Sequence, residues 1–212
     1  MRVIKSVVTT DTVLTSSNIP EDEYPAWVAS TSYNASDKVI FEHKIYEAIL
    51  THSSTTTPDL DQTNWLSLGA TNRYRMFDNV VSNVSSRLGG IEFTLTPNEV
   101  VNGIAFLNLN ATTVRVVVTD PTAGVVYDKT KELTGSSEVT DYYSYFFAPL
   151  VDLNNLKLAI FSDLPSNYPL ASISVTIRSG VGVAEVGEVV YGVQTTVGRT
   201  NYGTDNRKTR PH

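Results

Sequence analysis

Four aromatic residues are the strongest candidates for chemistry in this chain: Trp27, Tyr33, Tyr46 and Trp65 fall within 39 positions. A pyranose has an apolar C–H face that stacks on an exposed Trp or Tyr ring, while nearby polar groups bind its hydroxyls. Such a cluster therefore indicates a carbohydrate-binding platform. The same rings would also suit the core of a small module, so both interpretations stand at this point.

The polar residues do not favour catalysis. His43 and His52 lie nine positions apart in different predicted elements, and the third histidine is terminal. Residues 59–64 begin like a calcium loop but carry Asn64 where that loop needs glycine. The sequence contains no His-Glu-x-x-His motif, no Gly-x-Ser-x-Gly elbow and no glycine-rich phosphate loop. We therefore predict no catalytic residue, no metal and no cofactor.

Composition excludes several other function classes. The 212 residues include 16 Lys and Arg against 22 Asp and Glu, for a net charge of −6, which argues against general nucleic-acid binding. No apolar run approaches the roughly 18 residues of a membrane-spanning helix. The absence of cysteine excludes disulfides, thiolate catalysis and Cys-ligated zinc. We expect no nucleic-acid partner and no membrane insertion.

The β-branched content predicts an all-β fold. Val occurs 27 times and Thr 26 times, a quarter of the chain, and both residues pack better on sheets than in helices. Turn residues separate short apolar runs at residues 91–95, 104–109, 114–118, 125–127, 143–147, 156–161 and 173–177. About eight short strands in about 120 residues predict a β-sandwich of jelly-roll type. Residues 78–88 fit a short helix or an irregular crossover equally well.

Changes in composition divide the chain into four parts. We predict an N-terminal arm or linker at residues 1–20, a small β module at 21–69, the β-sandwich at 70–190 and a basic C-terminal tail at 191–212. Within the small module, apolar residues on either side of a polar turn at residues 42–44 predict a two-stranded hairpin.

The two ends of the chain are candidates for assembly contacts. The apolar patch in residues 1–20 is either a strand followed by a linker or an arm that adds a strand to a neighbouring subunit. From residue 199 onward four basic residues face one acidic residue, so the end of the tail carries a net charge of +3. Arg207, Lys208 and Arg210 could dock this tail on a neighbour, or the tail could simply be solvated.

An ordered set of aromatic motifs occupies residues 24–69. In chain order these are Trp27, Tyr-Asn-Ala-Ser-Asp-Lys-Val at residues 33–39, Lys-Ile-Tyr-Glu-Ala at residues 44–48, Pro58 and Trp65. The order and spacing resemble those of the small chitin- and cellulose-binding modules of carbohydrate-binding families 5 and 12. Ser36 and His43 replace two glycines of the family pattern, and residues 49–52 replace its exposed aromatic pair. The resemblance implies a carbohydrate-binding-module-like β domain.

A second motif follows directly, with Gly-Ala-Thr-Asn-Arg-Tyr-Arg-Met-Phe-Asp at residues 69–78. It resembles a segment of tail-associated structural proteins of tailed bacteriophages, where it follows a carbohydrate-module-like domain and opens a β-sandwich. The glycine-rich residues 192–203 resemble phage tail segments more weakly. We expect Arg73 to pair with Asp78 or with a carbonyl across the domain junction, and Met76 and Phe77 to anchor the edge of the sandwich. Tyr74 alternates with the two arginines if the run is extended.

Together these features predict a non-catalytic virion structural protein of a tailed phage, in the tail, baseplate or fibre-attachment region. Such a protein would be made in the host cytoplasm and would assemble as a homo-oligomer with other virion tail proteins. Host-surface polysaccharide would be a further partner of the small module. The alternative is a carbohydrate-binding module of a bacterial polysaccharide-degrading system.

Overall fold

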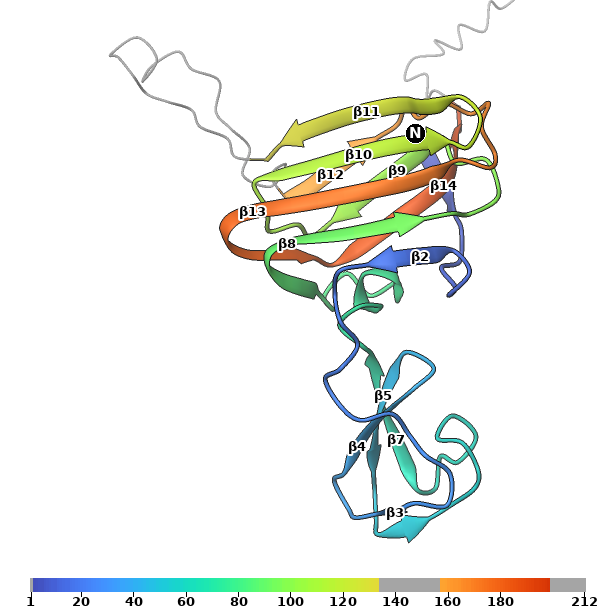
Figure 1. Cartoon of the computed structure of the whole chain (residues 1–212), viewed down its shortest axis with the longest axis vertical. Coiled ribbons are helices and arrows are strands. Elements are labelled where there is room, and N and C mark those ends of the chain that lie inside the picture. Colours follow the sequence, from blue (N-terminus) through green and yellow to red (C-terminus); the bar gives the residue numbers. More distant parts are fainter. Residues whose placement is uncertain (1, 134–156, 199–212) are drawn as a thin grey trace, which may run out of the picture.

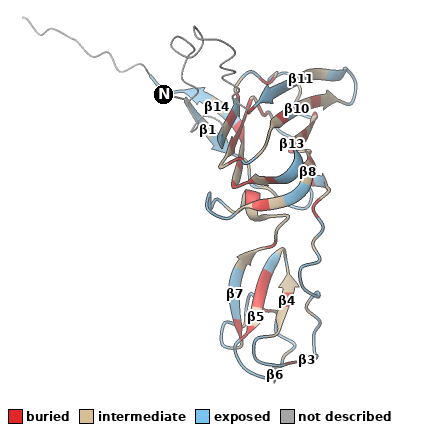
Figure 2. Cartoon of the chain, turned by 90° about the vertical axis from the view of Figure 1, so that its left-hand side faces the viewer, coloured by how far each residue is buried: buried red, intermediate tan, exposed pale blue. Residues whose placement is uncertain are grey.

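The computed structural model describes residues 2–133 and 157–198, which form a β-sandwich and a smaller β module joined end to end (Figure 1). Their buried side chains form two separate hydrophobic clusters, a large one in the sandwich and a small one in the module. Figure 2 shows the buried residues between the layers of the sandwich, with a narrower buried strip along one strand of the module.

Within the described residues, the sandwich consists of two antiparallel sheets. The four-stranded sheet has the order β1 (Arg2–Ser6), β14 (Glu188–Thr196), β9 (Gly103–Leu107) and β12 (Leu158–Phe161). The five-stranded sheet has the order β11 (Gly124–Glu132), β10 (Thr113–Asp120), β13 (Ser172–Val186), β8 (Ser85–Leu95) and β2 (Leu14–Ser17). The predicted all-β sandwich is thus confirmed.

Alternation along the strands builds the sandwich core. Val114 and Val116 on β10 face inward and are fully buried, as are Ile104 and Phe106 on the opposite sheet. Phe106 meets Phe161 edge to face, with ring centroids 6.1 Å apart. Burying each such side chain contributes roughly 1.5–3 kcal/mol, so this alternation supplies much of the energy that holds the two sheets together.

The edge strand β11 turns charged side chains toward β12. Lys129 and the hydroxyl of Tyr127 both donate hydrogen bonds to Asp163, and Lys131 donates to the carbonyl of Ile160. These bonds lower the pKa of the Asp163 carboxyl, with the Lys129 bond the largest cause. Inward-pointing lysines discourage another strand from pairing with the edge.

The small module contains two short sheets. One pairs β3 (Ser32–Tyr33) with β6 (His52–Ser53), and the other has the order β4 (Lys38–Phe41), β5 (Lys44–Ala48) and β7 (Trp65–Ala70). The predicted hairpin is confirmed, since β4 and β5 are joined by Glu42 and His43. Both turn residues have positive φ, 45° and 63°, as a two-residue hairpin turn with the twist of its strands requires.

Two predictions about the ends of the chain are corrected. Residues 1–20 are not an arm or linker throughout, because β1 pairs with β14 and β2 pairs with β8 of the same chain. Gly192 makes the first pairing possible, since a Cβ there would collide with the carbonyl oxygen of Lys5. The tail does not begin at residue 191, because Tyr191 is fully buried in the core and β14 continues to Thr196.

Some predictions fall on residues that are not described. The predicted strand at 143–147 and the basic residues Arg207, Lys208 and Arg210 lie outside the described ranges. The boundaries of the small module at residues 21 and 69 remain a prediction.

Candidate functional site

The segment after β7 connects the small module to the sandwich through hydrogen bonds in both directions. The backbone N–H of Thr71 donates to the carbonyl of His43 in the hairpin turn at 2.8 Å. Asn72 exchanges two hydrogen bonds with the backbone of Ser86 on β8, at 2.9 and 2.8 Å. Arg73 Nε donates to the carbonyl of Ile19 at 2.7 Å. Arg73 therefore bonds a carbonyl at the junction rather than Asp78.

The next residues enter the sandwich as a short 3-10 helix, η1 (Arg75–Phe77), so the run is not extended. Met76 is fully buried in the sandwich core, and its N–H donates to Ser85 Oγ at 2.9 Å. Phe77 packs edge to face on Phe93, with ring centroids 5.7 Å apart. Asp78 instead bonds Val80 and Asn83 beyond the helix. Two large side chains thus anchor the junction segment in the core.

A charged cluster surrounds the tip of the β4–β5 hairpin. It consists of His43 with Asp11, Glu21, Arg73 and Tyr74, which we call the His43 cluster. The imidazole Nε2 lies 2.7 Å from Asp11 Oδ1, and Nδ1 lies 3.0 Å from Glu21 Oε1. The His43 ring stacks on Tyr74 with centroids 3.9 Å apart, and the Tyr74 hydroxyl donates to Asp11 Oδ1 at 2.6 Å.

The contacts of the His43 cluster shift the pKa values of Asp11 and Tyr74, which share the 2.6 Å hydrogen bond. The pKa of the Asp11 carboxyl lies below its ordinary value, mainly because Asp11 accepts a hydrogen bond from Tyr74 and, next, because it accepts one from His43. The pKa of Tyr74 is raised, mainly by burial and next by the hydrogen bond to the Asp11 carboxylate. Asp11 therefore stays ionised and accepts hydrogen bonds over a wide pH range, while Tyr74 keeps its hydroxyl proton and donates it in a hydrogen bond.

Glu21 connects the cluster to the start of the small module. Its side chain is only 14% exposed, and Oε1 accepts a hydrogen bond from Thr71 Oγ1 at 2.7 Å. Arg73 Nη1 lies 3.8 Å from Oε2. Thr71 itself is fully buried. One carboxylate thus binds an imidazole from the hairpin tip together with a hydroxyl and a guanidinium from the segment after β7.

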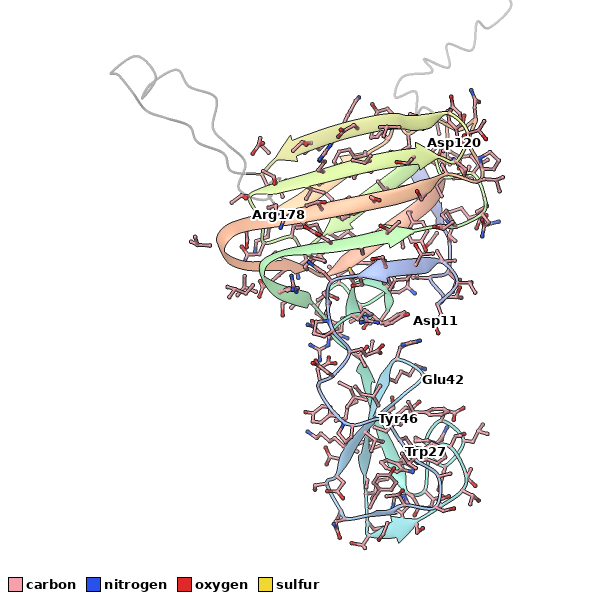
Figure 3. All side chains as sticks on the ribbon, in the orientation of Figure 1. Asp11, Trp27, Glu42, Tyr46, Asp120 and Arg178 are labelled. Atoms are coloured by element: carbon pink, nitrogen blue, oxygen red, sulfur yellow. The ribbon has the colours of Figure 1, made fainter. Side chains whose placement is uncertain are left out.

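Two grooves adjoin this hairpin tip and share Glu42 and His43. The junction groove, of about 450 Å³, is lined by Thr9, Thr10, Asp11, Glu42, His43, Lys44, Ala70, Tyr74, Phe77 and Asp78. The aromatic groove, of about 320 Å³, is lined by Glu21, Tyr24, Ala26, Trp27, Ile40, Phe41, Glu42 and His43. Figure 3 shows Asp11 at the end of the sandwich and Glu42 at the facing end of the module.

Three of the four residues predicted as a sugar platform are core residues instead. Tyr33, Tyr46 and Trp65 are 8%, 5% and 2% exposed, and they pack together with Val39 and Ala48. A buried ring cannot offer a face to a sugar, so these three are not binding residues. The small module has so few apolar side chains that its aromatics must fill its core.

Trp27 differs from these rings because it lines the aromatic groove. It is half-buried, and its ring meets Phe41 edge to face at 5.5 Å. Tyr24 lies in the same groove and is 36% exposed, with Lys38 Nζ 5.6 Å from its ring centroid. Sequence reasoning missed Tyr24, although its position three residues before Trp27 was a usable signal.

Comparisons with known proteins give no family assignment. No protein-family model matches the sequence, and no curated protein matches it. Among solved structures, the lectin domain of Lectinolysin complexed with Lewis B antigen aligns at a TM-score of 0.38 and 11% identity, over 55% of this chain and 80% of that one. CBM32-3 from a family 31 glycoside hydrolase of Clostridium perfringens gives 0.38 and 12%, over 56% and 80%. Chitosan-binding module 1 from a Paenibacillus sp. IK-5 chitosanase/glucanase gives 0.36 and 10%, over 56% and 83%. TM-scores this low support no conclusion about a ligand of this chain.

Aliphatic residues follow β5, where the modules that residues 24–69 resemble have an exposed aromatic pair. Ile49 and Leu50 follow β5 and are both exposed. Branched aliphatic side chains lack the flat π-face on which a sugar stacks, so this end of the module is not a stacking surface. The aromatic groove, near the opposite end of the β4–β5 hairpin, is therefore the better candidate site.

The described residues lack two other kinds of feature. In residues 2–133 and 157–198, no group of three or more His, Asp or Glu side chains is arranged to hold a metal ion. No helix in that part of the chain is long and apolar enough to cross a membrane.

Proposed function

We propose that this chain is a non-catalytic glycan-binding protein whose contact site is the aromatic groove. The observation that carries the proposal is the presence of Tyr24 and Trp27 in one groove that Glu21 and Glu42 also line. Aromatic faces bind the apolar side of a sugar ring, and carboxylates accept hydrogen bonds from its hydroxyls. The resemblance of residues 24–69 to chitin- and cellulose-binding modules supports the same ligand class.

Backbone hydrogen bonds hold the groove in shape without a ligand. The Trp27 N–H donates to the carbonyl of Ile40 at 2.9 Å, and the Ile40 N–H donates to the carbonyl of Pro25 at 2.9 Å. The strand that carries Phe41 is thus tied to the segment that carries the other two rings. Such preorganisation lowers the entropy cost of binding, and several copies on one particle or surface would add avidity to a weak single contact.

Replacing Tyr24 and Trp27 together by alanine should weaken glycan binding by about tenfold or more, because each aromatic contact is worth roughly 1 kcal/mol. We would measure retardation by affinity electrophoresis in gels that contain glycol chitin, hydroxyethylcellulose or xylan. Leu66→Ala is the matched control, since Leu66 is an exposed residue of the same module outside the groove. The single variant Tyr24→Ala is a second test that we expect to fold, because Tyr24 is partly exposed. Equal retardation of wild type and both Tyr24 variants, or no retardation of wild type in any gel, would contradict the proposal.

We propose a tailed-phage virion component as the second candidate function, because residues 69–78 resemble the phage tail segment and form the junction described above. The protein would then be made in the host cytoplasm, assemble with other tail proteins and carry its small module outward to host-surface polysaccharide. Quantitative mass spectrometry of purified particles should find this chain in multiples of three or six. Deleting residues 199–212 should reduce its incorporation if the basic tail is a docking arm. Absence of the chain from particles would overturn this candidate.

A further inference from the structure

We infer that the His43 cluster is a proton-dependent latch that fixes the orientation of the small module on the sandwich. Both ring nitrogens of His43 face carboxylate oxygens, those of Asp11 at 2.7 Å and of Glu21 at 3.0 Å. An ionised carboxylate only accepts hydrogen bonds, and a neutral imidazole has a single N–H. Only the doubly protonated imidazolium can donate to both carboxylates, so the observed arrangement requires the charged ring.

The two carboxylates come from different parts of the fold, which is why the proton matters for orientation. His43 stands at the tip of the β4–β5 hairpin of the small module, whereas Asp11 lies in the turn that precedes β2 of the sandwich. Glu21 lies in the segment that connects β2 to the module. The imidazolium therefore joins the module to the sandwich through Asp11 and to the connecting segment through Glu21.

The other charged groups around the ring do not replace this bond. Arg73 is directed at Glu21 and at the carbonyl of Ile19, and the Tyr74 hydroxyl is already donated to Asp11. Glu42 and Lys44 flank His43 in the hairpin and line the junction groove. If His43 loses its second proton, a ring nitrogen lone pair faces an anion and one of the two charge-assisted bonds is lost.

The latch operates within a pH window that is bounded on both sides. A ring that has given up one of its two N–H protons cannot donate to both carboxylates, so the latched state is lost as the pH rises. On the acid side, Tyr74 and His43 lower the pKa of Asp11. The stabilisation that ionised Asp11 gives to the latch is present above the ordinary carboxyl pKa, and it is lost as the pH falls through the pKa of Asp11 in the folded protein. The Asn72–Ser86 bonds involve no titrating group and keep the two parts connected at either extreme.

Distance measurements between two spin labels test the latch directly. The chain has no cysteine, so Thr55→Cys and Thr122→Cys would place unique labels at an exposed loop of the module and an exposed turn of the sandwich. Double electron–electron resonance should give a single narrow distance at about pH 5.5 and a broadened distribution at about pH 8.5. Loss of one bond to a charged group should raise the ratio of unlatched to latched molecules by about tenfold.

Three further variants decide the outcome. His43→Asn and Asp11→Asn should give the broad distribution at both pH values, and Asp11 is 68% exposed, so its replacement poses little risk to folding. His52→Asn should keep the wild-type response, because Nδ1 of His52 bonds the carbonyl of Leu50 within the module. Identical wild-type distributions at both pH values, or a pH response that survives in His43→Asn, would overturn the latch. No glycan is present in this experiment, so its result is independent of the proposed binding function.

Discussion

Replacing Trp65 by alanine is expected to unfold the small module while leaving the sandwich folded. Trp65 is 2% exposed and touches both neighbouring rings edge to face, Tyr33 at 5.0 Å and His52 at 4.9 Å. A buried Trp→Ala change costs about 3–5 kcal/mol through lost contacts and the cavity left behind. The module's hydrophobic cluster has only five buried residues, so this loss is comparable to its whole stability. The large core of the sandwich contains none of these residues.

Fluorescence can follow this loss because the chain has two tryptophans, and the variant retains only Trp27. Trp27 emission should shift to the red at a temperature where strand circular dichroism from the sandwich persists. Leu66→Ala is the control, since Leu66 is the next residue on β7 and points to solvent. A single transition at the wild-type temperature would show that Trp65 does not hold a separate module together.

The hairpin and most sandwich strands could be predicted because their pattern is local. In the hairpin, apolar strands flank a polar turn at residues 42–44, and the positive φ of Glu42 and His43 is the geometry that a tight hairpin needs. Along β10, nearly continuous valines indicated a strand buried on both faces, and this was right for one face only: Val114, Val116 and Val118 face the core, whereas Arg115 is exposed and Val117 is half-buried. Each of these inferences used neighbouring residues only.

The pairing of β1 and β2 could not be predicted, because it depends on partners far away in the sequence. Arg2 pairs with Thr196 and Leu14 with Leu95, so the short N-terminal strands gain their hydrogen bonds from residues that no local pattern identifies. Residues 1–20 are also rich in Ser and Thr, and their apolar patch fits a strand of the same chain and an arm on a neighbour equally well. A strand that is stabilised mainly by its partners looks like a linker in the sequence.

The candidate site was partly predictable for a related reason. The type of an aromatic residue does not say whether its ring is buried: Trp27 lines a groove, whereas Trp65 lies in the core. The junction motif pointed to Arg73 and Tyr74, but His43, Asp11 and Glu21 come from three other segments. Only the fold brings these charges together, and in the sequence His43 stood out mainly as the replacement of a glycine.

Replacing Glu21 by alanine is expected to release the small module from its fixed position and to destabilise the junction by about 2–3 kcal/mol. The carboxylate accepts a hydrogen bond from Thr71 at 2.7 Å and pairs with His43 and Arg73. Without it, the buried Thr71 hydroxyl has lost its acceptor and two cationic groups have lost a shared anion. The penalty comes mainly from these unpaired partners, which is why it exceeds that of an exposed ion pair.

Limited proteolysis of the connecting segment at residues 18–23 measures the release, and urea denaturation measures the loss of stability. Asp22→Ala removes the same charge from the adjacent exposed position and should leave both measurements close to wild type. Glu21→Gln should fall between the two, because its amide oxygen can still accept from Thr71 but its amide group carries no charge to balance His43 and Arg73. If Glu21→Ala is cleaved no faster than Asp22→Ala, Glu21 does not hold the module in place, and the orientation must then depend on Asn72, Arg73 and the anchored Met76.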